Sequence, residues 1–252
     1  MDTPRASNAA EKVLRVLDAL GYQRRLADIA RAADLPKTTV HRILHTLVEQ
    51  DFAHVDGQGG YAPGGRLLGL AGRALGRADA MAGAEPALRR LQQRTTATVH
   101  LAVLVGDEAV YVRKLEADKP YRMISRIGMA VPLHCTSIGK AILSCLPEPD
   151  VQAVVARTGL PARTAHTLTS ADRLLADLRA TASRGWSLDQ EENELGVVCA
   201  GAPVRDHTGR ATAAVSVSQL RSDPAALPLD ALGPRVAVAA AEVSAGLGAP
   251  VG

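Results

Sequence analysis

Residues 26–54 read LADIARAADLPKTTVHRILHTLVEQDFAH, and this stretch decides the fold of the first part of the chain. Apolar residues at helical spacing predict a short helix over residues 26–34 and a longer helix over residues 36–50. Pro36 suits the first position of the longer helix, because the N–H that proline lacks would have no partner there. Upstream, residues 8–20 form an amphipathic segment that begins at a capping asparagine. We therefore expect three helices at the head of the chain.

The longer helix has a polar face opposite its apolar side, and this face carries side chains that suit the major groove of DNA. Arginine can bind guanine edges, and threonine can bind phosphates or thymine methyl groups. The candidate DNA-binding residues are Lys37, Thr38, Thr39, His41, Arg42, His45 and Thr46. The alternative is a helix whose polar face is simply solvated.

The residues after this helix alternate around a glycine-rich turn, which predicts a two-stranded hairpin over about residues 52–62. Three helices followed by a hairpin make a winged helix-turn-helix, with the helix-turn-helix itself over about residues 26–48. The wing tip has Asp56 and no cation, so we do not expect it to read the minor groove strongly. Pro63 and the two glycines after it predict an early end to the wing and a loose hinge to the next helix.

Composition argues against several other classes of protein. The chain has 252 residues, of which 47% are hydrophobic, 22% charged and 2% aromatic, and its net charge is +3. So few aromatic rings argue against a platform that stacks RNA or single-stranded DNA bases. Three cysteines without a CxxC pair argue against a disulfide framework and a zinc knuckle. Signal-peptide and membrane-spanning patterns are lacking, so we expect a cytoplasmic protein without a membrane partner.

The second half of the sequence predicts a mixture of strands and helices. Residues 98–105 and 109–115 flank a Gly-Asp turn, as two antiparallel strands do. Residues 213–219 form another alternating strand, and residues 229–247 form an alanine-rich helix. This pattern is typical of an α+β domain.

Two features of this half indicate a binding site for a small molecule. Residues 136–139 precede an apolar helix over residues 140–146, and the free N–H groups at a helix start can bind an anion. Ser216 and Ser218 lie two residues apart on a strand and therefore share a face. Two hydroxyl groups and a helix N-terminus would suit a small carboxylate or a hydroxylated acid.

Three stretches of the sequence resemble the IclR family of bacterial transcription regulators. They are the stretch quoted first, VPLHCTSIGKAIL (131–143) and GWSLDQEENELGVVCAGAPVRDHTG (185–209). The last of these is the most specific, because its marked residues all fall at the family spacing: Gly185, Asp189, Glu191, Glu192, Gly196, Cys199, Pro203 and Asp206. The resemblance runs from about residue 7 to residue 247.

The resemblance implies a division of the chain into three parts. These are a winged helix-turn-helix over residues 6–66, a linker helix with dimer contacts over residues 67–80, and a GAF-like α+β domain for effector binding and oligomerisation over residues 81–250. The effector contacts that the resemblance implies are Met123, Val131, Ser137, Ile138, Gly139, Asp189, Cys199, Ser216 and Ser218.

Three of these residues bear on which ligand the site would bind. Family members often have a small Gly-Ala pair where this chain has Ser137 and Ile138, so the identity of the ligand does not transfer. Asp189 is expected to accept a hydrogen bond from a ligand hydroxyl. Its alternative role is to cap or bond the loop around Trp186.

These observations predict a DNA-binding transcription regulator that responds to a small organic effector and represses a catabolic or metabolic operon. We expect a homodimer or a tetramer on a pseudo-palindromic operator in double-stranded DNA, without a cofactor. No enzyme is expected, because the sequence has neither a G-x-S-x-G elbow nor a glycine-rich phosphate loop. The alternative is a regulator that senses a metal or thiol oxidation through His134, Cys135 and Cys199.

Overall fold

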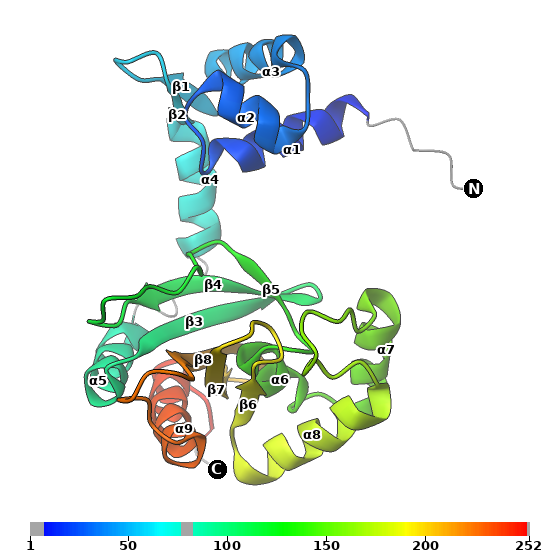
Figure 1. Ribbon diagram of the computed structural model, residues 1–252, viewed down its shortest axis with the longest axis vertical. Coiled ribbons are helices and arrows are strands. Elements are labelled where there is room, and N and C mark those ends of the chain that lie inside the picture. Colours follow the sequence, from blue (N-terminus) through cyan, green and yellow to red (C-terminus); the bar gives the residue numbers. More distant parts are fainter. Residues whose placement is uncertain (1–7, 77–82, 251–252) are drawn as a thin grey trace. The chain divides into compact units, whose positions relative to one another are not determined.

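The computed structural model describes residues 8–76 and 83–250, and the chain divides into two compact units, Met1–Arg77 and Ala78–Gly252 (Figure 1). This division lies inside the segment expected to be a linker, residues 67–80, so the domain boundaries given above stay a prediction. Within the described ranges, no helix is long and apolar enough to cross a membrane.

The N-terminal unit begins with the three expected helices, α1 (Ala9–Leu20), α2 (Leu26–Ala33) and α3 (Lys37–Glu49). The Asn8 side chain accepts a hydrogen bond from the Glu11 N–H at 2.8 Å, which caps α1 as predicted. Pro36 is the N-cap of α3 and not its first residue, because its ψ of 140° is still extended. Apolar residues from all three helices form one core: Val16, Ala19, Leu20, Ile29, Ala30, Ala33, Val40, Leu44 and Leu47.

The wing is a short antiparallel hairpin, β1 (Ala53–Val55) and β2 (Tyr61–Pro63), followed by helix α4 (Gly65–Gly76). The expected loose hinge after Pro63 is wrong, because the start of α4 is anchored. Asp51 accepts hydrogen bonds from the Gly65 and Arg66 N–H groups at 3.3 and 3.1 Å, and the Arg66 guanidinium lies 5.2 Å from the centre of the Phe52 ring.

Helix α4 covers part of the expected linker helix. It begins two residues before residue 67, and residues 77–80 of the prediction lie outside the described part of the chain. Gly64, just before α4, lies too close to the backbone of Asp51 to carry a side chain. A Cβ atom there would meet the Asp51 carbonyl oxygen at 2.3 Å, so the junction requires glycine.

The C-terminal unit is built on a six-stranded antiparallel sheet with the order β5-β4-β3-β8-β7-β6. The strands are β3 (Thr98–Val105), β4 (Glu108–Leu115), β5 (Ala130–Pro132), β6 (Ser187–Gln190), β7 (Val197–Arg205) and β8 (Ala211–Leu220). The helices are α5 (Glu85–Thr95), α6 (Ser137–Leu143), α7 (Glu148–Thr158), α8 (Ala171–Arg184) and α9 (Leu229–Gly246).

The helices of this unit cover both faces of the sheet (Figure 1). Helices α5 and α9 pack on one face, where Val215 and Val217 of β8 enter their core. Helices α6, α7 and α8 contribute to the core on the other face, which Ala214 of β8 joins. Ser216 and Ser218 therefore point to the side of α6, as the alternation of a strand requires. The expected fold, a winged helix-turn-helix followed by a GAF-like α+β domain, is confirmed.

Helix α6 corrects one expectation. It begins at Ser137 and not at residue 140, and the Thr136 hydroxyl accepts a hydrogen bond from the Gly139 N–H at 3.0 Å. One N–H group of the expected anion site is therefore already satisfied within the chain. Gly139 itself is a packing position, since a Cβ atom there would lie 2.2 Å from the Leu133 Cα.

Candidate functional site

The outer face of α3 presents the candidate DNA-binding side chains to solvent. Lys37, Thr38, His41 and Arg42 are exposed, and Thr39 is half-buried. Pro36 offers no side-chain cap, so the first N–H groups of α3 stay open beside the Lys37 ammonium group. Open N–H groups at a helix start and a nearby cation suit a DNA phosphate.

Two of the candidate residues lie in the last turns of α3 and have local partners. The Thr46 hydroxyl donates to the Arg42 carbonyl oxygen at 3.3 Å, and His45 Nδ1 lies 3.4 Å from the Glu49 carboxylate. The Glu49 carboxylate disfavours a phosphate close to this end of the helix. The N-terminal half of α3, around Arg42, is therefore the stronger candidate for DNA contact.

The wing tip is closed by its own acid. Asp56 Oδ1 accepts hydrogen bonds from the Gln58 and Gly60 N–H groups at 2.9 and 2.8 Å. These backbone bonds hold the pKa of Asp56 below its usual value, so the carboxylate stays charged. A negative tip repels DNA phosphates, in line with the expectation that this wing does not read the minor groove strongly.

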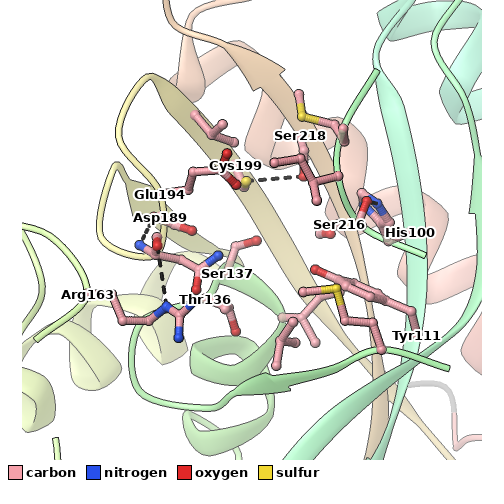
Figure 2. A pocket seen from close by; sticks show the side chains of 18 residues that line it. His100, Tyr111, Thr136, Ser137, Arg163, Asp189, Glu194, Cys199, Ser216 and Ser218 are labelled. Carbon is pink, nitrogen blue, oxygen red and sulfur yellow. Dashed lines mark hydrogen bonds between the residues drawn. The ribbon is translucent and has the colours of Figure 1, made fainter. Parts of the chain in front are cut away.

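The C-terminal unit contains a cavity of about 310 Å³ between the sheet and the start of α6 (Figure 2). Its walls come from all six strands of the sheet, from the start of α6, and from the loops before β5, after α7 and after β6. The cavity is lined by His100, Tyr111, Met123, Ile124, Ser125, Met129, Val131, Thr136, Ser137, Ile138, Arg163, Asp189, Asn193, Glu194, Val197, Cys199, Ser216 and Ser218.

The structure brings together all but one of the expected effector residues in this cavity. Those that line it are Met123, Val131, Ser137, Ile138, Asp189, Cys199, Ser216 and Ser218. Gly139 is the exception, because it packs against the backbone of Leu133 one residue beyond the cavity wall.

Asp189 is a buried carboxyl group in the cavity wall. Its Oδ1 accepts hydrogen bonds from the Glu192 and Asn193 N–H groups at 2.8 and 3.4 Å, so it shapes the loop that follows β6. Burial raises the pKa of Asp189 to about 7, and the Glu192 carboxylate adds to the rise. The side chain is therefore partly protonated near neutral pH, and it can donate or accept a hydrogen bond.

The hydroxyl groups of β8 differ in what they bind. The Cys199 thiol donates to the Ser218 hydroxyl at 3.1 Å, and burial raises the pKa of Cys199, so the thiol stays neutral. Within the described part of the chain, the hydroxyl groups of Ser216 and Tyr111 have no hydrogen-bond partner. These two groups are available to a bound molecule.

Charged side chains under the cavity hold the loop after β6. Lys140 is 1% exposed, and its Nζ lies 2.5 Å from Glu192 Oε1 and 3.0 Å from Asp177 Oδ2. Each of these three residues comes from a different element, namely α6, the loop after β6, and α8. Losing one partner of a buried ion pair is costly, so these contacts keep the loop in place.

The sequence reasoning named Met123 in the cavity wall but missed the neighbours of Met123 and the side chains that hold this segment. The segment around Met123 and Ser125 crosses the sheet and is held by a neighbouring pair on β3 and β4, His100 and Lys114. Lys114 Nζ donates to the Met123 and Ser125 carbonyl oxygens at 2.8 and 2.6 Å, and His100 Nε2 lies 2.7 Å from the Ser125 hydroxyl. We call residues 123–125 the strap.

Arg163 is the other residue that the sequence did not single out. It lies on the turn after α7, it is exposed, and it is the one Lys or Arg among the described residues that line the cavity. Its lone position after Pro161 and Ala162 gave no periodic or motif signal.

The alternative of a metal site at His134, Cys135 and Cys199 is wrong. Within residues 8–76 and 83–250, no group of three His, Cys, Asp or Glu side chains could hold a metal ion. His134 Nε2 instead lies 3.1 Å from the Pro161 carbonyl oxygen. Burial raises the pKa of Cys135 to about 12, so its thiol stays protonated near neutral pH.

Comparisons with known proteins agree with the two-part architecture. Residues 9–57 match the family described as "IclR helix-turn-helix domain", and residues 72–245 match "Bacterial transcriptional regulator IclR C-terminal". The chain is 34% identical to the HTH-type transcriptional regulator XynR of Escherichia coli over 85% of this chain and 86% of that protein. It is 32% identical to the HTH-type transcriptional repressor AllR of Escherichia coli over 82% of this chain and 76% of that protein.

A solved structure gives the same result at the level of the fold. The crystal structure of an IclR homolog from Microbacterium hydrocarbonoxydans in complex with 4-hydroxybenzoate superposes with a TM-score of 0.79. The two sequences are 25% identical, and the match covers 94% of this chain and 97% of that chain. With a helix-turn-helix, a hollow α+β unit and these relatives, the chain belongs to the IclR family of DNA-binding transcriptional regulators, which are not enzymes.

Proposed function

We propose that this regulator represses a catabolic or metabolic operon and that a small organic acid in the cavity of the C-terminal unit modulates its binding to DNA. The observation that carries the proposal is the cavity of about 310 Å³, which Ser137, Asp189 and Ser216 line with hydrogen-bonding groups. Repression is supported by the relative AllR, which is named a repressor. Such a protein works on the chromosome, which in a bacterium lies in the cytoplasm.

An acid with a hydroxyl group is the class of effector that the cavity favours. The free hydroxyl groups of Ser216 and Tyr111 can bind a polar group of the ligand, while Met123, Met129 and Val131 offer apolar contact. The relative whose crystal structure holds 4-hydroxybenzoate binds a compound of this class. The branched side chain of Ile138 narrows the cavity wall, so the acid that this chain prefers need not be the acid of its relatives.

A homodimer or a tetramer on a pseudo-palindromic operator is the proposed DNA complex. The most exposed large apolar side chains described in the N-terminal unit are Leu14 on α1, at 65%, and Leu68 on α4, at 60%, and they suit contact with a second copy. Two copies related by a twofold axis would place two α3 helices on half-sites about one helical turn apart or a multiple of it.

Arg42→Ala tests the DNA-binding part of the proposal. Sheared genomic DNA from the source organism is selected on the purified protein at several salt concentrations, and retained fragments are sequenced. We expect the wild-type chain to enrich an intergenic pseudo-palindrome. Arg42→Ala should weaken binding to this site by about 1–3 kcal/mol and relax one base position.

Arg173→Ala is the matched control, because it removes the same charge from an exposed position on α8 in the other unit. It should leave both affinity and sequence preference unchanged. If Arg42→Ala binds the selected site as tightly as the wild-type chain, the assignment of α3 as the reading helix is wrong. A salt-sensitive smear without an enriched site would contradict specific binding altogether.

A further inference from the structure

We propose that Arg163 is the residue that makes the cavity select a carboxylate, with the acid group of the effector bound by the terminal nitrogens of the guanidinium. This inference rests on the proposed function, since it concerns the ligand of the same cavity. It assigns the recognition of negative charge to a side chain outside the expected effector residues.

Arg163 is the one cationic side chain among the described residues that line the cavity. Its Nε donates to the Asn193 carbonyl oxygen at 3.4 Å, and its terminal nitrogens have no hydrogen-bond partner in the described part of the chain. Two acids also line the cavity, Asp189 and Glu194, yet neither forms an ion pair with Arg163 among the described residues. The guanidinium fork is thus free to bind a planar carboxylate with two hydrogen bonds.

The turn that carries Arg163 is fixed to the cavity wall. The Thr167 hydroxyl accepts from the Arg163 N–H at 3.0 Å and donates to the Glu192 carbonyl oxygen at 2.6 Å. The Thr164 hydroxyl donates to the Glu191 carbonyl oxygen at 2.6 Å. The turn is therefore fixed to the loop that Asp189 also holds, and a positioned side chain loses less entropy on binding than a mobile one.

The two ends of the cavity differ in chemistry, with Arg163 at one end and buried polar side chains at the other. Figure 2 shows Arg163 on the opposite side of the drawn residues from His100, Tyr111 and Ser216. Arg163 is exposed, whereas His100 is 1% and Ser216 is 2% exposed. A ligand with a carboxylate at the open end and a hydroxyl group at the closed end would bind both the Arg163 guanidinium and the buried Ser216 hydroxyl.

The alternative sites for a carboxylate within the cavity are weaker. The start of α6 has the Gly139 N–H bound to Thr136, and the helix has only 7 residues, so it offers little of a dipole. Asp189 would repel an anion in its charged form. The His100 ring is neutral, because burial lowers the pKa of His100 to about 3, so it supplies no positive charge.

The experiment measures binding of matched acids and amides to the full chain by isothermal titration calorimetry and thermal shift. The probes are benzoate, 4-hydroxybenzoate, lactate and glycolate, each beside its primary amide. We expect at least one acid to bind the wild-type chain, and Arg163→Gln to weaken that acid by about 10- to 100-fold. Arg163→Lys should weaken binding of the acid less, since lysine keeps the positive charge but lacks the two parallel N–H donors of the guanidinium.

Two controls distinguish a loss of carboxylate recognition from a loss of the fold. Arg173→Gln makes the same change on α8, away from the cavity, and should bind the acid like the wild-type chain. The matched amide should bind the wild-type chain and Arg163→Gln equally weakly, because it carries no charge for Arg163 to read.

The outcomes that overturn the inference differ from those that overturn the proposed function. If an acid binds Arg163→Gln as tightly as the wild-type chain, Arg163 does not read the carboxylate, while the acid effector stands. If amides bind as tightly as their acids, the cavity selects shape and not charge. If no acid binds the wild-type chain, the acid class in the proposed function fails, and the role of Arg163 fails with it.

Discussion

Asp189 is the residue whose protonation links the cavity to pH. Its pKa is raised from 3.8 to about 7 by burial, so between these values the folded chain holds a proton that the unfolded chain has lost. The free energy of unfolding therefore falls as the pH rises through this window, and the loss is complete above about pH 7. Asn in place of Asp removes this titration and keeps a side-chain oxygen for the Glu192 N–H.

We therefore expect the stability difference between the wild-type chain and Asp189→Asn to change by about 1–3 kcal/mol between pH 5 and pH 8, with the wild-type chain losing stability. Urea unfolding of both proteins at each pH measures this. The difference is the proper observable, because buried His100 and His134 have lowered pKa values and act with the opposite sign below pH 6.5. Parallel curves for the two proteins would show that Asp189 does not titrate in this range.

The strap is held by two side chains from the sheet, of which Lys114 forms two hydrogen bonds and His100 one. Lys114→Met removes the two hydrogen bonds that Lys114 makes to strap carbonyl oxygens, at 2.8 and 2.6 Å, and keeps an apolar stem of similar length. We expect faster amide hydrogen exchange in the peptide that covers residues 123–125, while exchange in β3 and β4 stays as in the wild-type chain.

Glu116→Gln is the control for this experiment. Glu116 forms an ion pair with Lys114 at 2.8 Å but no hydrogen bond or ion pair with the strap among the described residues, so Glu116→Gln tests the effect of this ion pair alone. Exchange in the strap should then remain slow. If both variants exchange like the wild-type chain, the Lys114 bonds do not hold the strap.

Elements with a local pattern were predictable from the sequence, and contacts between distant segments were not. The spacing of apolar residues in α2 and α3 and the alternation of β3 and β8 depend on neighbours along the chain. By contrast, the turn of Arg163 is held at the cavity by contacts with residues about thirty positions later. Arg163 donates to the Asn193 carbonyl oxygen, and Thr164 donates to the Glu191 carbonyl oxygen. The periodicity also misplaced the start of α6, because Thr136 caps the helix three residues before its apolar run suggests.

The candidate site shows the same division. The resemblance gave Met123 of the strap and side chains of β5, α6, β6, β7 and β8, whereas Ile124, Ser125 and Arg163 lie in loops without a motif. Gly139 was taken for a ligand contact, yet it serves the packing of α6 against Leu133. A glycine in a sequence cannot reveal which backbone comes close to it.

At the scale of the whole molecule, each of the two units has a core of its own. We therefore expect two transitions in calorimetric unfolding of the full chain. Ile29→Val, in the core of the N-terminal unit, should lower only one of the two melting temperatures, and Ile142→Val, in the C-terminal unit, only the other. Each change removes one buried methyl group, worth about 0.5–1.5 kcal/mol.

An acid that binds the cavity should raise only the transition that Ile142→Val lowers, because the ligand stabilises the unit that holds it. Scans with and without the acid identified by titration measure this. A single cooperative transition that both variants shift would contradict independent units.

The positions of the cavity residues in the fold bear on how such regulators evolve. Met123, Arg163 and Glu194 stand on loops, while the core that holds α5 and α9 to the sheet lies on the opposite face. Substitutions at these loop positions alter what the cavity admits and leave that core intact. Gene duplication can therefore yield daughter regulators whose cavities differ while the scaffold is inherited unchanged.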